Sequence, residues 1–401
     1  MEDEASVTIL MSGKFNILDN MIEYLPLKRI TALRGAEIRE AVNRVVDSGW
    51  YLRGKETETF EQSFAAYTGK KYCATCGNGL DALSLIIRSY KEIGMLHDDD
   101  EIIVPANTYI ASILSITENG LKAVLVEPDK DNFQIDDKKI EEAITSRTKA
   151  IMIVHLYGEN AYTDRIGDIC KRNKLILIED CAQAHGLNKL LKRDNRPIAD
   201  KYSVCAYSFY PGKNLGALGD AGAVVTNDKE ICELVKAMGN YGSSEKYVFP
   251  YQGRNSRMDE IQAAVLSVKL KYLDAENSQR REIARRYIDN VFNPLISLPS
   301  VVYWQQSVFH IFPVFCEKRV ELRQFLLENG VQTMIHYPIP PHKQGCYSSS
   351  SVLMNNGSSD PKDFSLSITE KIHDTELSIP LNQAMTPDEV GRVIDILNKF
   401  Y

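Results

Sequence analysis

The sequence predicts an α/β protein built around a mainly parallel sheet, with a smaller α+β region toward the C-terminal end. Short runs that are apolar throughout, such as residues 150–154 and 175–178, alternate with segments of helical periodicity. Strands that are apolar on both faces indicate a parallel sheet covered by helices on both sides. After about residue 293 the pattern changes to strand, helix and strand, which indicates a second, smaller unit.

The predicted elements follow one another after a first stretch of about twenty residues that has no clear period. Helical segments are expected at 33–49, 54–69, 77–94, 136–149, 163–174, 257–292, 320–330 and 385–401, and a strand followed by a helix at 100–120. Further strands are expected at 122–129, 150–158, 175–180, 204–210, 221–228, 308–318 and 331–338. Thr386, Pro387 and Glu389 predict a capped start for the last helix, and the Ser/Asn/Gly-rich segment 347–363 predicts a mobile surface loop.

These patterns divide the chain into four parts. They are an N-terminal extension (1–24), a large α/β domain (25–255), a linking helix (256–292) and a small C-terminal α+β domain (293–401). A chain of 401 residues is long for one domain, which favours a division of this kind.

Composition and charge argue against several classes of protein. The net charge of −7, without a basic stripe, argues against a nucleic-acid partner. No apolar run approaches membrane-spanning length and no signal-like segment opens the chain, so we expect a cytoplasmic protein. The single C-x-x-C pair, Cys73 and Cys76, lacks the second pair or histidine cluster of a typical zinc site, and no metal is expected.

Two glycines, Gly77 and Gly79, directly precede the predicted helix in "GNGLDAL". Free N–H groups and the positive end of the helix dipole make such a turn a seat for phosphate. A tight turn without a ligand fits the same residues, so this stretch alone does not decide between the two.

Polar and aromatic side chains follow two other predicted strands. Asp180 ends the apolar run "LILIED", where a carboxylate is costly to bury unless it meets a cation or several donors. Gln183 and His185 follow in "CAQAHG", and Tyr109 in "VPANTYIAS" is placed to pack flat on a planar ligand. A helix cap is the alternative for Asp180, and core packing is the alternative for Tyr109.

The segment "SFYPGKNLGALGD" carries Lys213 among glycines, after Ser208 and Tyr210. It is not a nucleotide-binding P-loop, because Asn214 follows the lysine and Tyr207 stands where the first glycine belongs. A lysine that is buried loses basicity and becomes an amine nucleophile able to form a Schiff base, whereas a solvated lysine is only a surface charge. Phosphate seat, aromatic ring, strand-end carboxylate and lysine, in this order, match what pyridoxal phosphate requires.

The same stretches resemble the DegT/DnrJ/EryC1/StrS sugar aminotransferases, which have the type I fold of pyridoxal-phosphate-dependent transferases. The likeness runs from about residue 25 to the C-terminus and is most specific in five segments. They are "GNGLDAL", "PANTYIAS", "EDCAQAHG", "SFYPGKNLGALGDAGAVVTND" and "GRNSRMDEIQAAV". One departure is Ala221, where relatives commonly have glycine.

The resemblance implies a role for each candidate residue. Lys213 would carry the cofactor, Asp180 would hold its ring nitrogen, Gln183 its ring hydroxyl, and Tyr109 would stack on the ring. The phosphate would be bound by Ser208, Gly77, Asn78 and, from the partner of a homodimer, Asn255 with Arg257 beside it. The implied substrate contacts are His185, Tyr210, Arg257, His336 and Tyr337.

The stretch "IHYPIPPHKQ" resembles relatives that aminate C3 of a nucleotide-linked 3-oxo-6-deoxyhexose, so we expect L-glutamate as donor and a dTDP-linked sugar as acceptor. Amination at C4 is the alternative within the family, and a non-catalytic cofactor-binding regulator is the alternative outside enzymology. A sugar dehydratase of this family has histidine in place of the lysine, so Lys213 argues against that activity. Amino sugars of this kind would serve a surface polysaccharide such as the O-antigen of lipopolysaccharide.

Overall fold

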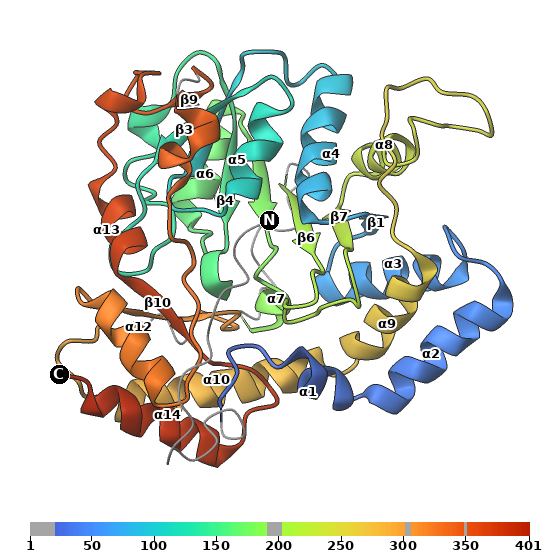
Figure 1. The fold of residues 1–401 in the computed structure, drawn as a ribbon. Coiled ribbons are helices and arrows are strands. Elements are labelled where there is room, and N and C mark those ends of the chain that lie inside the picture. Colours follow the sequence, from blue (N-terminus) through green and yellow to red (C-terminus); the bar gives the residue numbers. More distant parts are fainter. Residues whose placement is uncertain (1–20, 191–202, 301–305, 349–350) are drawn as a thin grey trace, which may run out of the picture.

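The computed structural model describes residues 21–190, 203–300, 306–348 and 351–401, and an eight-stranded sheet crosses its larger part (Figure 1). The sheet has the order β1–β7–β6–β5–β4–β2–β3–β9. Its strands are β1 (Tyr72–Cys76), β2 (Glu101–Pro105), β3 (Lys122–Val126), β4 (Thr148–Val154), β5 (Ile176–Asp180), β6 (Ser203–Ser208), β7 (Gly222–Thr226) and β9 (Leu353–Met354). Within this sheet only β7 runs antiparallel to its neighbours, which confirms the predicted mainly parallel sheet.

Helices cover both faces of the sheet. One face is covered by α4 (Gly79–Glu92), α5 (Ile110–Thr117) and α8 (Lys229–Met238), and the other by α3 (Lys55–Thr68), α6 (Asp164–Asn173), α7 (Leu187–Leu190) and α9 (Glu260–Leu270). Because side chains alternate along a strand, Cys76 of β1 enters the core beneath α4 while Cys73 enters the core beneath α3. The two cysteines of the C-x-x-C pair therefore belong to opposite faces.

The expected single linking helix at 256–292 is in fact two helices. The first is α9, and α10 (Leu273–Asn290) follows after a break at Lys271 and Tyr272. The apolar residues of α9 are explained by its neighbours, since α9 packs against both α3 and α2 (Gly35–Ser48). A short helix, α1 (Leu27–Ala32), precedes α2.

A second core gathers the C-terminal elements, drawn in orange and red in Figure 1. They are β8 (Phe312–Phe315), α12 (Arg319–Glu328), α13 (Ser367–Thr375), β10 (Glu376–Ile379) and α14 (Pro387–Lys399), which pack with α10. Strands β8 and β10 form a two-stranded antiparallel sheet, and the predicted capping box of α14 is present. The expected strand at 331–338 is reduced to isolated bridges, from Val331 to Ile22 and from Met334 to Ser378.

Two further segments differ from expectation. The predicted helix at 136–149 is instead a 3-10 turn (Glu141–Ala143) followed by the start of β4, and the Asp136 side chain favours a turn by accepting the N–H of Lys138. In the expected loop at 347–363, Leu353 is fully buried and β9 extends the large sheet beside β3. Asn355 fixes this edge by donating to the Leu125 carbonyl oxygen (2.9 Å).

The predicted N-terminal extension falls mostly outside the described residues, since it covers 1–24 and the structure describes it from residue 21. The described part is tied down, because Ile22 is buried in the second core and pairs with Val331. In the described ranges, no helix has both the length and the apolar character needed to cross a membrane.

Candidate active site

A cavity of about 650 Å³ opens at the edge of the sheet where the parallel strands end. This edge is the usual position of ligand sites in open α/β sheets. The predicted site residues that line the cavity are Asn78, Tyr109, Asp180, Gln183, Ser208, Tyr210, Lys213, His336 and Tyr337. Most follow strands of the large sheet, whereas His336 and Tyr337 belong to the C-terminal part of the chain. The fold thus brings together residues that are far apart in the sequence.

The turn that carries Lys213 is held from several sides. The Lys213 N–H donates to the Tyr210 carbonyl oxygen (2.8 Å), which closes the turn after β6. The buried Asn214 side chain donates to Asn277 Oδ1 of α10 (2.9 Å) and to the Val308 carbonyl oxygen (3.2 Å). Lys269 of α9 donates to the Gly216 carbonyl oxygen. The lysine is therefore presented by a fixed backbone.

The amine of Lys213 is less basic than that of an ordinary lysine. Burial lowers the pKa of Lys213 to about 8, and the nearby negative charge of Asp180 raises it in part. At neutral pH a lysine with this pKa has a larger unprotonated fraction than an exposed lysine has. The unprotonated amine is the nucleophile needed for Schiff-base chemistry.

Asp180 is buried at the end of β5, and its hydrogen bonds with described residues come from neutral donors. Its Oδ1 accepts the N–H of Ala182 (3.1 Å), and its Oδ2 accepts the hydroxyl of Ser112 (2.8 Å), which is also 2.8 Å from the Thr108 hydroxyl. Burial raises the pKa of Asp180, while these donors and Lys213 lower it. Ser112 and Thr108 were not predicted: Ser112 lies in the first turn of α5 and Thr108 directly before its N-cap, Tyr109.

The start of α4 forms another part of the cavity wall. The Asn78 side chain caps the helix by accepting the N–H of Asp81 (2.8 Å), and the amides of Gly79 and Leu80 have no partner within the helix. Ser208 lies so close that a Cβ on Gly79 would be 2.6 Å from the Ser208 Cβ. Glycine is needed here, and the free amides beside a hydroxyl form a site suited to an anion.

In the segment that contains Ala221, the close backbone approach is made by Gly222. A Cβ on Gly222 would lie 2.2 Å from the Asn78 carbonyl oxygen, so β7 contacts the α4 cap through this glycine. Ala221 instead packs in the core on the α3 side of the sheet. The alanine at this position is therefore accommodated without loss of the approach.

A hydrogen-bonded group of side chains forms another part of the cavity wall and includes residues from the C-terminal part of the chain. Gln183 accepts the N–H of Tyr157 (2.5 Å) and donates to the Tyr337 hydroxyl (3.0 Å). The Tyr337 ring lies 4.9 Å from the half-exposed ring of Tyr109. Tyr157, which was not predicted, also donates to the His336 carbonyl oxygen (2.7 Å) and so links the residues that follow β4 to the C-terminal part of the chain.

Four predicted residues do not line the cavity of their own chain. Gly77 donates its N–H to Ser256 Oγ (3.0 Å). His185 is fully buried beside the rings of Tyr207 and Phe209, and burial lowers its pKa to about 3.

The other two are Asn255, which pairs with Asn240 through its backbone, and Arg257, which donates to the Asn240 side chain (3.2 Å). Their segment is linked to α4 by an ion pair between Arg254 and Asp81 (2.6 Å).

Pyridoxal phosphate has a chemical group suited to each of three features of the cavity: the buried carboxylate, the free amides of α4 and the amine of lowered pKa. Its ring nitrogen, when protonated, supplies the cation that the buried Asp180 lacks among its neutral donors. Its phosphate suits the free amides of α4 beside Ser208, and its aldehyde reacts with an amine of lowered pKa such as that of Lys213. The fold and the site together define a pyridoxal-phosphate-dependent enzyme.

Comparison with known proteins narrows this class to a family. Residues 33–398 match the model of the DegT/DnrJ/EryC1/StrS aminotransferase family, and the chain belongs to that family. It is 49% identical over 397 residues to a dTDP-3-amino-3,6-dideoxy-alpha-D-galactopyranose transaminase of Aneurinibacillus thermoaerophilus. That alignment covers 95% of this chain and 99% of the relative.

Two solved structures support the same assignment. The structure of Streptomyces venezuelae DesV in complex with a ketimine intermediate has a TM-score of 0.87 and 39% sequence identity, and the match covers 94% of this chain and 98% of DesV. The structure of NtdA from Bacillus subtilis with bound cofactor PMP has a TM-score of 0.82 and 31% identity, covering 94% of this chain and 84% of NtdA. The chain is accordingly an aminotransferase that uses pyridoxal phosphate.

We predict that Lys213 of the cofactor-free protein titrates near pH 8, because burial disfavours its charged form. Reductive methylation with formaldehyde and cyanoborohydride at a series of pH values, read by peptide mass spectrometry, measures this midpoint. Replacing Asp180 by Asn should move the midpoint lower, because the negative charge of Asp180 favours the ammonium form. A midpoint near 10.5, the ordinary lysine value, would contradict this description of the site.

Proposed function

We propose that the protein transfers the amino group of L-glutamate to C3 of a dTDP-linked 3-oxo-6-deoxyhexose. The product is then a dTDP-3-amino-3,6-dideoxyhexose, and glutamate leaves as 2-oxoglutarate. The observation that carries the proposal is the 49% identity, over almost the full length of both chains, to a transaminase named for such a sugar. The cavity supports it, since its volume of about 650 Å³ is within the range of small-molecule sites.

The cofactor, when bound, supplies the electron sink and carries the amino group between donor and acceptor. We assign the proton transfers to Lys213, whose amine lines the cavity and has a pKa of about 8. A pKa near the working pH lets one amine both accept and return a proton. In the second half of the reaction its Nζ delivers the proton that ends on C3 of the sugar.

We assign the remaining cofactor contacts to residues of the cavity wall. Asp180 pairs with the ring nitrogen, and Gln183, already fixed by the N–H of Tyr157, faces the ring hydroxyl. Tyr109 offers its half-exposed ring for stacking. The phosphate is bound by Ser208 and the cap of α4 at Asn78. Gly77 supports this cap from outside the cavity, because it bonds Ser256, which in turn bonds Asp81.

The sugar contacts are assigned to residues on the open side of the cavity. His336 and Tyr337 line it from the C-terminal part, and the exposed Tyr210 lines it from the lysine turn. His185 has a structural part instead, since it is buried between aromatic rings and does not reach the cavity.

The alternatives differ in the product. An enzyme acting at C4 would leave the amino group one carbon away, and a non-catalytic regulator would bind the cofactor without releasing 2-oxoglutarate. The lowered pKa of Lys213 and its position in the cavity favour turnover over a purely binding role.

We also propose a homodimer in which each subunit completes the site of the other. Asn255 and Arg257 do not line their own cavity, yet Tyr241, Tyr247 and Phe249 of the same region are exposed by half or more. Exposed aromatic rings that gather in one region mark a surface for a protein partner.

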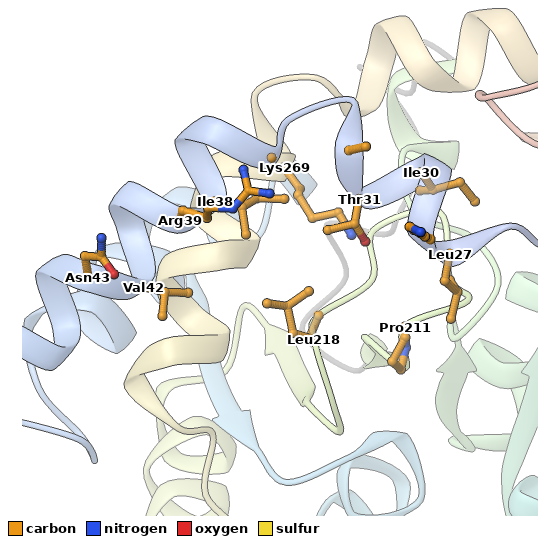
Figure 2. A pocket seen from close by; sticks show the side chains of 14 residues that line it. Leu27, Ile30, Thr31, Ile38, Arg39, Val42, Asn43, Pro211, Leu218 and Lys269 are labelled. Carbon is orange, nitrogen blue, oxygen red and sulfur yellow. The ribbon is translucent and has the colours of Figure 1, made fainter.

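A second unfilled surface supports the dimer. A groove of about 810 Å³ lies between α1, α2 and the loop that follows Lys213 (Figure 2). Its lining is largely apolar and includes Ile30, Val42, Pro211 and Leu218. A second copy seated here would bury these side chains and brace the loop of the catalytic lysine.

A cytoplasmic location and a role in building a surface polysaccharide such as an O-antigen agree with a nucleotide-sugar substrate.

The proposed reaction predicts glutamate-dependent amination of dTDP-3-oxo-6-deoxygalactose or of its glucose epimer, with nitrogen at C3 of the product by NMR. Lys213→Ala should lower turnover by about a thousandfold or more, because it removes both nucleophile and proton carrier. Lys130→Ala, at an exposed position, is the matched control. Nitrogen at C4, or cofactor binding without 2-oxoglutarate release, would select one of the alternatives.

Shared sites predict that two inactive variants restore each other. Asn255→Asp places a carboxylate near the partner's phosphate and should be inactive, as should Lys213→Ala. Equal amounts of the two, mixed and refolded, form mixed dimers with one intact site. We expect about a quarter of the wild-type activity from random pairing. If the mixture stays as inactive as its parts, Asn255 does not serve the partner's site.

A further inference from the structure

A buried chain of polar groups runs behind His336, on the side away from the cavity. The His336 Nδ1 is 2.8 Å from the hydroxyl oxygen of Ser378, and Ser378 is hydrogen-bonded to Glu376 Oε1. The other carboxyl oxygen, Glu376 Oε2, accepts the backbone N–H of His336 (2.6 Å). Glu376 and Ser378 belong to β10 and both are fully buried. This series of hydrogen bonds therefore reaches His336 at two atoms, its ring Nδ1 and its backbone nitrogen.

The protonation of Glu376 decides which nitrogen of His336 carries the hydrogen. If Glu376 is a neutral acid, Oε1 donates to Ser378, the serine hydroxyl donates to Nδ1, and the imidazole proton must be on Nε2. If Glu376 is ionised, the serine hydroxyl donates to the carboxylate, and Nδ1–H donates to the serine oxygen. The lone pair is then on Nε2. Because His336 lines the cavity, the two cases present a donor or an acceptor to the ligand.

The surroundings favour the neutral acid. Glu376 has no solvent exposure, and no described Lys, Arg or His side chain forms an ion pair with its carboxyl group. Arg319, the cation that acts on it, contacts the backbone carbonyl oxygen of Glu376 (3.5 Å). A carboxylate buried without a cation is costly, so the proton is retained. In agreement, burial raises the pKa of Glu376 to about 8.

His336 itself is uncharged in this setting. Burial, and next the positive charge of Lys213, lower the pKa of His336 to about 4. A neutral imidazole has one N–H only, so the partner of Nδ1 determines what Nε2 can do.

We propose that Glu376 and Ser378 are positioning residues that hold His336 in the Nε2–H form, so that it donates a hydrogen bond to an oxygen of the sugar. This inference rests on the proposed function, in which His336 contacts the sugar. It also predicts selectivity at His336 Nε2: a sugar oxygen that accepts a hydrogen bond is bound there, and a group that can only donate a hydrogen bond is rejected. Ionisation of Glu376 reverses this selectivity and weakens sugar binding.

The other titratable groups near His336, Ser378 and Glu376 are Tyr24, Lys213, His310, Arg319 and Tyr337. Burial raises the pKa values of Tyr24 and Tyr337, and burial lowers that of His310, so these three are uncharged over the relevant range. Lys213 titrates near the same pH as Glu376. A pH profile of the wild type alone is therefore ambiguous, and a variant must separate the two groups.

Glu376→Gln makes this separation, because the amide keeps an acceptor for the His336 N–H and a permanent donor for Ser378. Lys213 is unchanged in this variant. In the wild type, the sugar KM should rise about tenfold as the pH passes above about 8, whereas in Glu376→Gln this rise should be absent. Ser378→Ala should raise the sugar KM about tenfold at neutral pH while the glutamate half-reaction is little changed. Ser89→Ala, which removes another buried hydroxyl far along α4, is the matched control.

Nitrogen-15 NMR of histidine-labelled protein reads the form of the imidazole directly and needs no substrate. The chain has seven histidines, and the signal of His336 is identified by its loss in His336→Asn. We expect the Nε2–H form in the wild type at neutral pH, the Nδ1–H form in alkaline buffer, and the Nε2–H form at both in Glu376→Gln. An Nδ1–H form in Glu376→Gln, or an alkaline rise in KM that this variant retains, would overturn the proposal. If the sugar is not aminated at all, the proposed function fails, but the NMR result still decides the form of His336.

Discussion

The site is organised around a buried carboxylate to which, among the described residues, no cationic side chain is hydrogen-bonded. Asp180 ends the central strand β5, and its partners there are the N–H of Ala182 and the hydroxyl of Ser112. Two neutral donors and the charge of Lys213 compensate this buried carboxylate only in part, since burial still raises its pKa, so a cation bound directly beside it would complete the site. A protonated pyridine ring meets this need, and in meeting it keeps the electron-withdrawing form on which transamination depends.

The other features of the cavity follow once the ring is fixed by this pairing. Because the parallel strands end at one edge, the cap of α4 and Ser208 are available to the phosphate, and Lys213 shares the loop that follows Ser208. Asp180 also acts on the lysine, since its charge raises the pKa that burial lowers to about 8. The C-terminal part adds the proposed sugar contacts, His336 and Tyr337, which are held by Tyr157, Gln183 and the hydrogen-bonded groups from Glu376.

Much of this arrangement could be predicted from the sequence, because it depends on local patterns. Apolar strand runs and the glycines around Asn78 and Lys213 indicated the sheet edge and its loops. What the sequence did not reveal depends on distant contacts: β9 is a strand because Leu353 is buried beside β3, and Glu376 matters because β10 lies behind His336. His185 shows the converse, since it is near the site in sequence but turned into the aromatic core. The roles of Asn255 and Arg257 stay predictions, as do those of the residues that line the cavity.

The most direct test is the protonation of the cofactor ring nitrogen in the bound enzyme. Pyridoxal phosphate labelled with nitrogen-15 in the ring can be loaded into the wild type and into Asp180→Asn, and its chemical shift followed with pH. If Asp180 requires a cation, the ring nitrogen stays protonated in the wild type through neutral and mildly alkaline pH and loses the proton in Asp180→Asn. A ring nitrogen that is unprotonated in the wild type at neutral pH, or equally protonated in both proteins, would contradict this account.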